Sequence, residues 1–277
     1  MGRCLEPTSA WRGWEGPVSR SILGADPTPS GEPVSASIQT PSTSGTGSAL
    51  GDALDLLNVL HEPTAVFNRI NERPRVLIPW LVLGVFLIVL AILVQPYQSA
   101  AFEAFKATLT PEQVAKMGNR GAGGGAVGFV LYPVLVFIGV AAGAGLLWIG
   151  VSLTGTQARY KTLLSVLTYS CVTYVLFSIV AVLVLKVRGI QAITGFEDVR
   201  APLGLDLLVP GAGLFAGTVL NGINLFSVWG VWLTGTGIST THKTSRAASI
   251  AVAAAAFLIM LFIVSLPTLF AAMMIKQ

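Results

Sequence analysis

The sequence predicts an all-α membrane protein, a polytopic bundle of five transmembrane helices with short interfacial amphipathic helices. Hydrophobic residues make up 53% of the 277 residues and charged residues only 11%, whereas a soluble domain carries about 25% charged residues. Uncharged stretches recur along the chain, and about 20 such residues cross a bilayer core of roughly 30 Å. The expected spans are residues 76–95, 126–153, 162–185, 222–241 and 247–275.

The chain divides into a tail and a membrane domain. Residues 1–52 are rich in Ser, Thr, Pro and Gly and are expected to be disordered, because such a segment buries too little apolar surface to order itself. Whether this tail belongs to the natural protein or is an over-long start to the reading frame stays open. The membrane domain is expected over 53–277, and its first span begins too late for a cleaved signal peptide, which occupies about the first 30 residues.

Two short helices are expected outside the spans. In EPTAVFNRINERPR, Val66, Phe67 and Ile70 recur at helical spacing between arginines, which predicts an amphipathic helix at the membrane surface. A second helix is expected in the loop 96–126, where Thr110 and Gln113 form a capping box around a proline at the first helical position.

Glycine motifs in the chain are interpreted as structural. Gly123, Gly125 and Gly128 satisfy G-x-G-x-x-G, but the strand and the acidic residue that a dinucleotide site needs are missing. This stretch is interpreted as a flexible hinge. The small-residue pairs Gly139–Gly143 and Gly213–Gly217 would allow close helix contact, within the bundle or in an oligomer.

Polar residues inside the third and fourth spans allow two interpretations. Ser170, Tyr174 and Ser178 share one helix face, and they either line a polar pathway or bond to their own or a neighbouring helix. A buried amide also needs a partner. We predict that Asn221 helps to start the fourth helix, that Asn224 bonds to hydroxyls of the third span, and that Trp229 lies within the bundle.

Residues 202–221 are apolar but are broken by Pro210 and Gly211. We expect a short interfacial or re-entrant segment there, with the fourth span starting near Asn221. A continuous span over 207–233 is the alternative.

Nothing in the sequence indicates catalysis, a cofactor or a metal. No ionisable side chain lies deep in a span, and no hydrolytic motif or P-loop is present. His61 and His242 are far apart in the sequence and are expected to be interfacial. Cys4 lies in the tail and Cys171 in a span, so no disulfide between them is expected. The basic residues are scattered, which predicts no nucleic-acid partner.

The distribution of basic residues predicts the orientation. With five spans, ten Lys and Arg residues fall on the side of the N-terminus and seven on the other side. The positive-inside rule therefore favours a cytoplasmic N-terminus. In a bacterium this would be a multi-pass protein of the cytoplasmic membrane.

The closing half of the chain resembles the Yip family, which comprises Rab-GTPase-interacting five-span membrane proteins and bacterial relatives. The family pattern is matched at Asn224, Phe226, Trp229 and Gly237, in the stretch LNGINLFSVWGVWLTGTGISTTHKTSRAASIAV. The entry helix matches at Pro63, Phe67 and Ile70, and Tyr169 stands in the usual place of the third span. The resemblance covers about 55–273. It implies an amphipathic segment over 203–221, a cytoplasmic N-terminus and no known catalytic residue.

Two functional hypotheses follow. The first is a non-enzymatic membrane adaptor or organiser that presents its tail, entry helix and basic loops to a protein partner at the cytoplasmic face. The alternative is a small-solute or ion transporter or channel-like protein with a pathway between the third and fourth spans.

Overall fold

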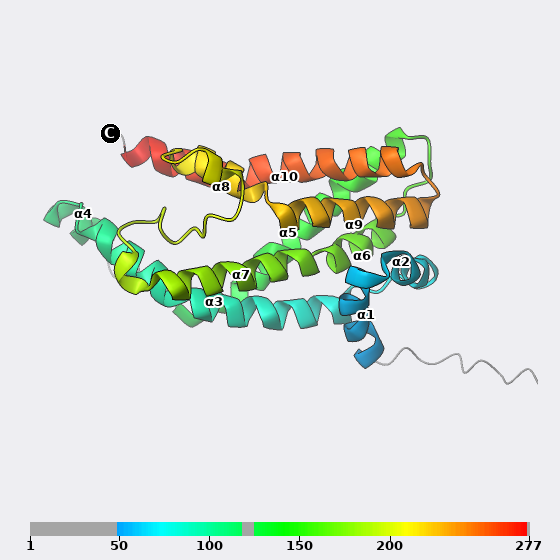
Figure 1. Cartoon of the computed structure of the whole chain (residues 1–277), viewed down its shortest axis with the longest axis horizontal. Helices are drawn as coiled ribbons and strands as arrows, with labels where there is room; N and C mark the ends of the chain where they lie inside the picture. Colours follow the sequence, from blue (N-terminus) through cyan, green and yellow to red (C-terminus); the bar gives the residue numbers. More distant parts are fainter. Residues whose placement is uncertain (1–48, 118–124, 276–277) are drawn as a thin grey trace, which may run out of the picture. The chain divides into compact units, whose positions relative to one another are not determined.

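The computed structural model describes residues 49–117 and 125–275, and in these two ranges it contains helices and no strand. All of them belong to one compact unit, residues 45–277 (Figure 1). The helices are α1 (Ala49–His61), α2 (Pro63–Glu72), α3 (Leu77–Lys106), α4 (Pro111–Met117), α5 (Gly125–Leu153), α6 (Tyr160–Ser170), α7 (Val172–Arg188), η1 (Ile190–Ala192), η2 (Leu205–Leu208), α8 (Leu214–Gly222), α9 (Leu225–His242) and α10 (Arg246–Ile275). The all-helical class is therefore confirmed.

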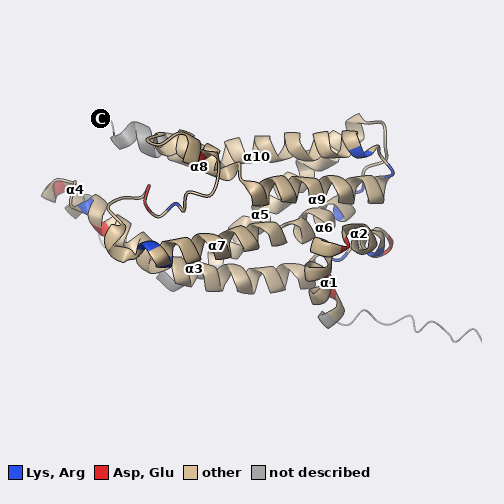
Figure 2. Cartoon of the chain, viewed as in Figure 1, with Lys and Arg blue, Asp and Glu red and all other residues tan. Residues whose placement is uncertain are grey.

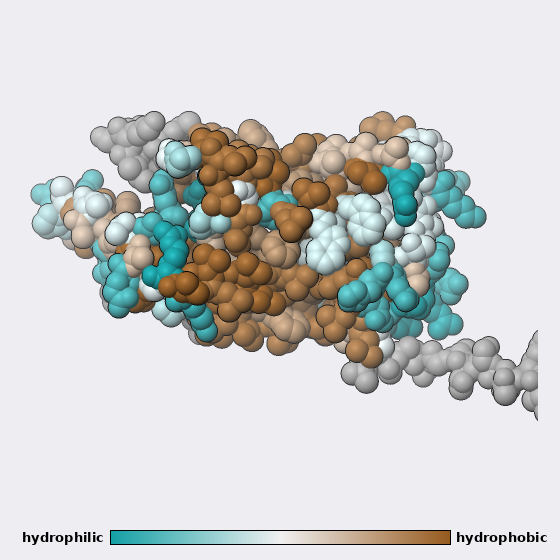
Figure 3. Space-filling model, viewed as in Figure 1, coloured by the Kyte–Doolittle hydropathy of each residue, from teal (hydrophilic) through white to brown (hydrophobic). Residues whose placement is uncertain are grey.

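Four segments of the described chain are long and apolar enough to cross a membrane: Leu77–Lys106, Leu131–Leu153, Tyr160–Arg188 and Arg246–Leu269. Lys, Arg, Asp and Glu residues gather at the two ends of these helices (Figure 2). A broad apolar surface lies between the hydrophilic ends (Figure 3). Because exposed aliphatic side chains are stable only against lipid over such an area, this surface is the part that faces the bilayer.

Helix α9 lies where the fourth span, residues 222–241, was expected, but it is not among the four segments that are long and apolar enough to cross a membrane. It packs against α2, α6, α7 and α10, and residues 233–238 are buried. Two of its hydroxyls bond locally, since Thr234 donates to the carbonyl of Gly230 at 2.8 Å and Thr241 to that of Gly237 at 2.7 Å. The hydroxyl of Thr236 is buried without a hydrogen-bond partner. Protein neighbours and backbone bonds therefore shelter side chains that would be costly against lipid.

The first span is longer than predicted. We expected it to end at residue 95 and a loop to follow, but α3 continues through Pro96 to Lys106. Ala101 is fully buried in a cluster with Leu185 and Ile193, and Phe105 contacts the ring of Phe196 at 5.6 Å between centroids. The free energy gained from this packing exceeds the cost of the backbone hydrogen bond that a proline removes.

The third span is interrupted at Cys171, between α6 and α7. The amide of Cys171 donates to the carbonyls of Leu167, at 3.0 Å, and Thr168, at 3.2 Å. The hydrogen bond between residues three positions apart tightens the helix locally, and no proline is needed for this. Residues 160–188 still form one segment that is long enough to cross the membrane.

The fourth-span region is divided as the sequence analysis preferred. α8 ends at Gly222, Ile223 is extended, and α9 begins after it. The alternative of one continuous span over 207–233 is therefore wrong. We call residues 189–224 the connector, because they join α7 to α9.

The remaining sequence predictions have mixed outcomes. The first described helix begins at Ala49, within the expected tail, and residues 1–48 lie outside the described part of the chain. The capping box of α4 is confirmed: the amide of Thr110 donates to Gln113 at 2.9 Å, and the amide of Gln113 donates to Thr110 at 3.4 Å. The hinge predicted from Gly123 also falls largely outside the described residues.

Candidate functional site: the entry platform and the connector

Three residues of the family pattern meet where α2 packs against α6 and α9. Phe67 and Tyr169 are buried in one hydrophobic cluster with Val166. Gly237 lies opposite them: a Cβ at that position would overlap Val166 and would stand 3.2 Å from the ring of Phe67. The missing side chain therefore makes the space that the aromatic ring of α2 fills.

The apolar face of α2 contacts protein, which corrects one expectation. We predicted an amphipathic helix whose apolar face lies in the membrane surface, but Val66, Phe67 and Ile70 are 0%, 0% and 3% exposed. Pro63 stands at the first helical position, which suits its ring geometry. α2 is thus a structural part of the bundle rather than a helix that rests on lipid.

Ion pairs join α1 to α2 and to a residue just before α3. Asp55 on α1 accepts two hydrogen bonds from Arg69 on α2, at 2.6 and 3.3 Å. Asp52, whose side chain is 5% exposed, pairs with Arg75 just before α3. Its Oδ2 atom is buried without a hydrogen-bond partner, so the carboxylate depends on that one arginine.

The loops at the same end are also tied together. Arg159, before α6, donates to the side chain of Asn71 on α2 and to the carbonyl of Thr241 on α9. Its amide donates to Nε2 of His242 at 3.1 Å. We call α1, α2 and the residues Arg75, Arg159 and His242 the entry platform.

The entry platform is the part of the site that sequence reasoning missed. Sequence reasoning recognised only the apolar stripe of α2. The hydrogen bonds of the entry platform join residues that are 14 to 90 positions apart in the chain, and no local pattern reveals them. A signal for α1 existed, since Leu56, Val59 and Leu60 recur at helical spacing next to Asp52.

His242, which we expected to be interfacial, is the last residue of α9 and is buried. Burial disfavours the imidazolium form, and the nearby Arg159 cation repels it, so the pKa of His242 lies below its ordinary value. The neutral ring accepts the Arg159 amide through Nε2, while Nδ1 stands 2.8 Å from the hydroxyl of Thr241. A proton on Nε2 would abolish the first of these contacts.

A pH dependence of stability follows from this site. The unfolded chain takes up a proton near the ordinary histidine pKa of about 6.5, whereas the folded protein resists it. Stability that is present above about pH 6.5 is therefore lost as the pH falls toward the lower folded pKa, by at most about 1.4 kcal/mol per pH unit. Thermal unfolding of the solubilised protein between pH 7.5 and 5.5 tests this. The variant His242→Gln should unfold with a flatter pH profile, and an equally steep profile would contradict the assignment.

Neither asparagine of the fourth-span region has the role that we predicted for it. Asn224 is the N-cap of α9: its Oδ1 accepts from the amide of Ser227 at 3.0 Å, and Ser227 Oγ accepts from the amide of Asn224 at 2.9 Å. Its Nδ2 donates to the carbonyl of Asn221. Asn224 therefore makes no hydrogen bond to the third span, and that prediction was wrong.

Asn221 holds the connector instead of starting the fourth helix. Its Nδ2 donates to the carbonyl of Ala201 at 2.8 Å and to Oδ2 of Asp206 at 3.0 Å. The other oxygen of Asp206 accepts from the amide of Gly204 at 2.9 Å. Gly204 in turn lies so close to α8 that a Cβ would stand 2.6 Å from the carbonyl oxygen of Asn221. The connector is thus folded back on the start of α9.

Removing the Asn221 amide should loosen the connector. In Asn221→Leu the carboxylate of Asp206 and the carbonyl of Ala201 lose a buried donor, which costs about 1–3 kcal/mol. We expect amide hydrogen exchange over residues 200–213 to become at least about tenfold faster, with α5 unchanged. Asn58→Leu, at an exposed position of α1, is the matched control. Equal exchange in both variants would show that Asn221 does not hold this segment.

The hydroxyls of the third span bond mainly to their own helix. Ser170 donates to the carbonyl of Val166, Thr173 to that of Ser170 and Ser178 to that of Tyr174, at 2.8 to 3.0 Å. Tyr174 shares a hydrogen bond of 2.9 Å with Tyr132 on α5. These contacts match the structural interpretation, because a hydroxyl with a backbone partner needs no water-filled pathway.

The last two residues of the family pattern lie near the start of α9. The ring of Phe226 meets that of Phe177 edge-on at 6.1 Å between centroids. Trp229 is half-buried, so it lies at the edge of the bundle rather than wholly within it. Among the residues that the structure describes, no group of three or more His, Cys, Asp or Glu side chains is close enough to hold a metal ion.

The fold and the site define a class: a multi-pass helical membrane protein whose polar contacts brace helices and loops. Comparison with known proteins agrees with this class. The family model of the Yip1 domain matches residues 57–266, and this chain belongs to the Yip1 domain family, a non-catalytic family of membrane proteins. It is similar to the membrane protein YknW of Bacillus subtilis (strain 168), with 29% identity over 199 residues, which cover 70% of this chain and 80% of YknW. No solved structure is significantly similar to it.

Proposed function

We propose that this protein is a non-enzymatic membrane adaptor that presents the entry platform to a protein partner. The observation that carries the proposal is the way α1 and α2 are held. The buried Phe67 anchors α2 in the bundle, and the pair of Asp52 with Arg75 ties α1 to the chain just before α3. A second ion pair joins α1 to α2. A rigid surface outside the membrane suits recognition, because little ordering entropy is lost on binding.

The outer face of the entry platform has the mixed chemistry of a protein-binding surface. Leu54 and Leu57 on α1 are 50% and 59% exposed. The side chains of Asn68 and Arg69 on α2, and of Arg73 just after it, are exposed as well. Apolar anchors with a charged rim are typical of protein interfaces, in which arginine is enriched.

We further propose five membrane crossings, with α9 as the fourth of them and the N-terminus in the cytoplasm. An 18-residue helix such as α9 is about 27 Å long, close to the bilayer core of about 30 Å. This topology puts loop 154–159 and loop 243–245 on the side of the entry platform, in agreement with the bond between Arg159 and His242. In a bacterium the membrane would be the cytoplasmic one.

Thiol accessibility tests this topology. Cys4 and Cys171 are replaced by serine, and single cysteines are placed at Thr156, in a loop, and at Gln191, in the short helix η1 at the opposite end of the bundle. A membrane-impermeant thiol reagent applied to intact cells should label position 191 and leave position 156 unlabelled until the cells are opened. The reverse pattern would place the N-terminus outside, and labelling of both positions from one side would refute the five-span topology.

Site-specific photo-crosslinking in native membranes tests the adaptor function. A photoreactive amino acid at Leu57 or Asn68 should give a discrete adduct with another protein. The same probe at Ile138, an exposed side chain of the apolar span α5, is the control and should give none. The adduct at Leu57 should disappear in Arg69→Glu/Arg73→Glu if the charged rim takes part in recognition. Lack of any adduct on the entry platform would count against the adaptor.

The transporter alternative makes a different prediction. A pathway between the third and fourth spans would need hydroxyls that are free to contact a solute, but Thr173 and Thr234 bond to backbone carbonyls. We therefore expect liposomes that contain the protein to be no more permeable to ions and small solutes than empty ones. A specific flux that Thr173→Val reduces would favour the transporter and overturn this choice.

A further inference from the structure

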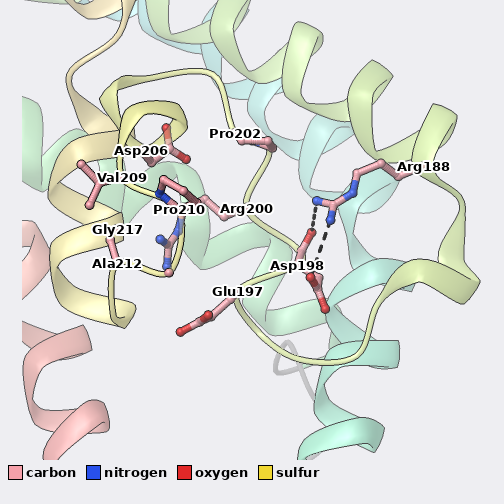
Figure 4. Close-up of a pocket in the computed structure, with 11 residues that line it drawn as sticks. Arg188, Glu197, Asp198, Arg200, Pro202, Asp206, Val209, Pro210, Ala212 and Gly217 are labelled. Atoms are coloured by element: carbon pink, nitrogen blue, oxygen red, sulfur yellow. Dashed lines mark hydrogen bonds and ion pairs between the residues drawn. The ribbon is translucent and has the colours of Figure 1, made fainter.

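A small charged cavity lies in the connector, at the end of the bundle opposite the entry platform (Figure 4). Its volume is about 200 Å³, below the roughly 300–1,000 Å³ of pockets for drug-sized ligands. The end of α7, the connector loop and α8 all contribute to its wall. The charged side chains of the wall are Arg188, Glu197, Asp198, Arg200 and Asp206.

Three of these charged side chains, Arg188, Asp198 and Asp206, already have partners within the protein. Asp198 stands 3.6 Å from Arg188 in an ion pair, and it also accepts from the hydroxyl and the amide of Thr194, at 2.7 and 2.8 Å. These hydrogen bonds hold the pKa of Asp198 below its ordinary value, so the carboxyl stays ionised. Asp206 is engaged by Asn221 and Gly204.

The other two charges, Arg200 and Glu197, have no partner of opposite sign within ion-pair distance in the described chain. Arg200 donates only a long bond of 3.3 Å to the carbonyl of Leu214. Its guanidinium lies against Gly217, where a Cβ would overlap it. Glu197 is exposed at the edge of the cavity. One cation and one anion of the same small cavity are therefore available to a ligand.

The edge of the cavity continues into an apolar surface. Val209 lines the cavity and is 48% exposed, and its neighbours Leu207 and Leu208 are 62% and 76% exposed. Aliphatic side chains this exposed, next to membrane-spanning helices, are stable in the outer part of the hydrocarbon layer. A ligand with a charged head and an apolar tail would place the head at Arg200 and Glu197 and the tail along Leu207 and Leu208.

We propose that this cavity binds the zwitterionic headgroup of a phospholipid that carries a primary amine. Arg200 would bind the phosphate, which a guanidinium recognises through paired N–H donors. Glu197 would accept hydrogen bonds from the ammonium group. The two arginines and three carboxylates of the wall sum to a charge of −1, which disfavours a headgroup that is only anionic.

A primary ammonium also suits the cavity better than a quaternary one. It donates three hydrogen bonds, as a lysine does, whereas a choline group donates none. Glu197 should therefore distinguish phosphatidylethanolamine from phosphatidylcholine by about tenfold, the worth of one hydrogen bond to a charged group. Arg200 should contribute to the binding of both lipids.

Native mass spectrometry of the full-length protein in detergent tests the proposal. The probes are phosphatidylethanolamine, phosphatidylcholine and phosphatidylglycerol with identical acyl chains, together with soluble O-phosphoethanolamine. The variants are Glu197→Gln and Arg200→Gln. Lys186→Gln is the matched control, because Lys186 is exposed at the same end of α7 without lining the cavity. Thermal unfolding shows which variants are folded, and the exposed Glu197 provides a test that does not depend on Arg200.

We expect phosphatidylethanolamine to bind about tenfold more tightly than phosphatidylcholine, with that preference lost in Glu197→Gln and unchanged in Lys186→Gln. Arg200→Gln should weaken both lipids. Equal binding of the three lipids, or preference for phosphatidylglycerol, would overturn the proposal. Binding of O-phosphoethanolamine as tightly as the lipid would assign the cavity to a soluble zwitterion and overturn the lipid assignment.

Discussion

Replacing Phe67 by alanine should lower the free energy of unfolding by about 3–5 kcal/mol. The ring is 0% exposed and fills the space left by Gly237 between α2 and α9. Truncation removes buried apolar surface and leaves a cavity, since the long helices α6 and α9 cannot collapse into it. Denaturant unfolding of the protein in mixed micelles or bicelles measures the loss.

Phe86→Ala is the control for this substitution. Phe86 lies on α3, also in the ordered bundle, and is 50% exposed, so the same truncation should change the free energy of unfolding much less. A similar loss in both variants would mean that Phe67 has no special place in the core. A small loss at Phe67 alone would mean that α2 is not anchored by its aromatic side chain. In Phe67→Ala we also expect the photo-crosslinks of the entry platform to weaken.

Loss of Arg75 should have a comparable effect for an electrostatic reason. In Arg75→Gln the carboxylate of Asp52 keeps its buried position without its counter-charge, and breaking a buried pair from one side costs about 3–5 kcal/mol. The second carboxylate oxygen, Oδ2, already has no partner, so nothing nearby replaces the arginine. The same unfolding measurement applies.

The pair of Arg69 with Asp55 is the matched control. It also joins an arginine to an aspartate of α1, but its side chains are 52% and 19% exposed, against 32% and 5% for Arg75 and Asp52. Water replaces a lost partner at such a site, so Arg69→Gln should cost only about 0–1 kcal/mol. Adding Asp52→Asn to Arg75→Gln should restore part of the stability. Equal losses from the two arginine variants, or no gain in the double variant, would contradict this account.

Local rules predicted some elements correctly. Thr110, Pro111 and Gln113 were sufficient to place the start of α4, because a capping box involves only residues three positions apart. The long apolar runs likewise predicted the membrane helices, since about 20 uncharged residues have few alternatives to spanning a bilayer. In both cases the physical cause lies within the segment itself.

Tertiary contacts explain where the sequence predictions failed. A capping role near the start of the fourth helix was correctly expected, but it was assigned to Asn221 instead of Asn224. What separates the two residues is the bond of Asn221 to Ala201, 20 positions away, which no local pattern reveals. The extension of α3 through Pro96 depends in the same way on Ile193 and Leu185.

The helix α9 also has a consequence for biogenesis. In the proposed topology the other spans are apolar enough to enter the membrane one at a time as they leave the ribosome. α9 is not, because its threonines and glycines are favourable only against protein neighbours. It would therefore insert together with α10, as a helical hairpin closed by residues 243–245. A chain truncated after His242 would leave its last helix outside the bilayer, exposed to proteolysis.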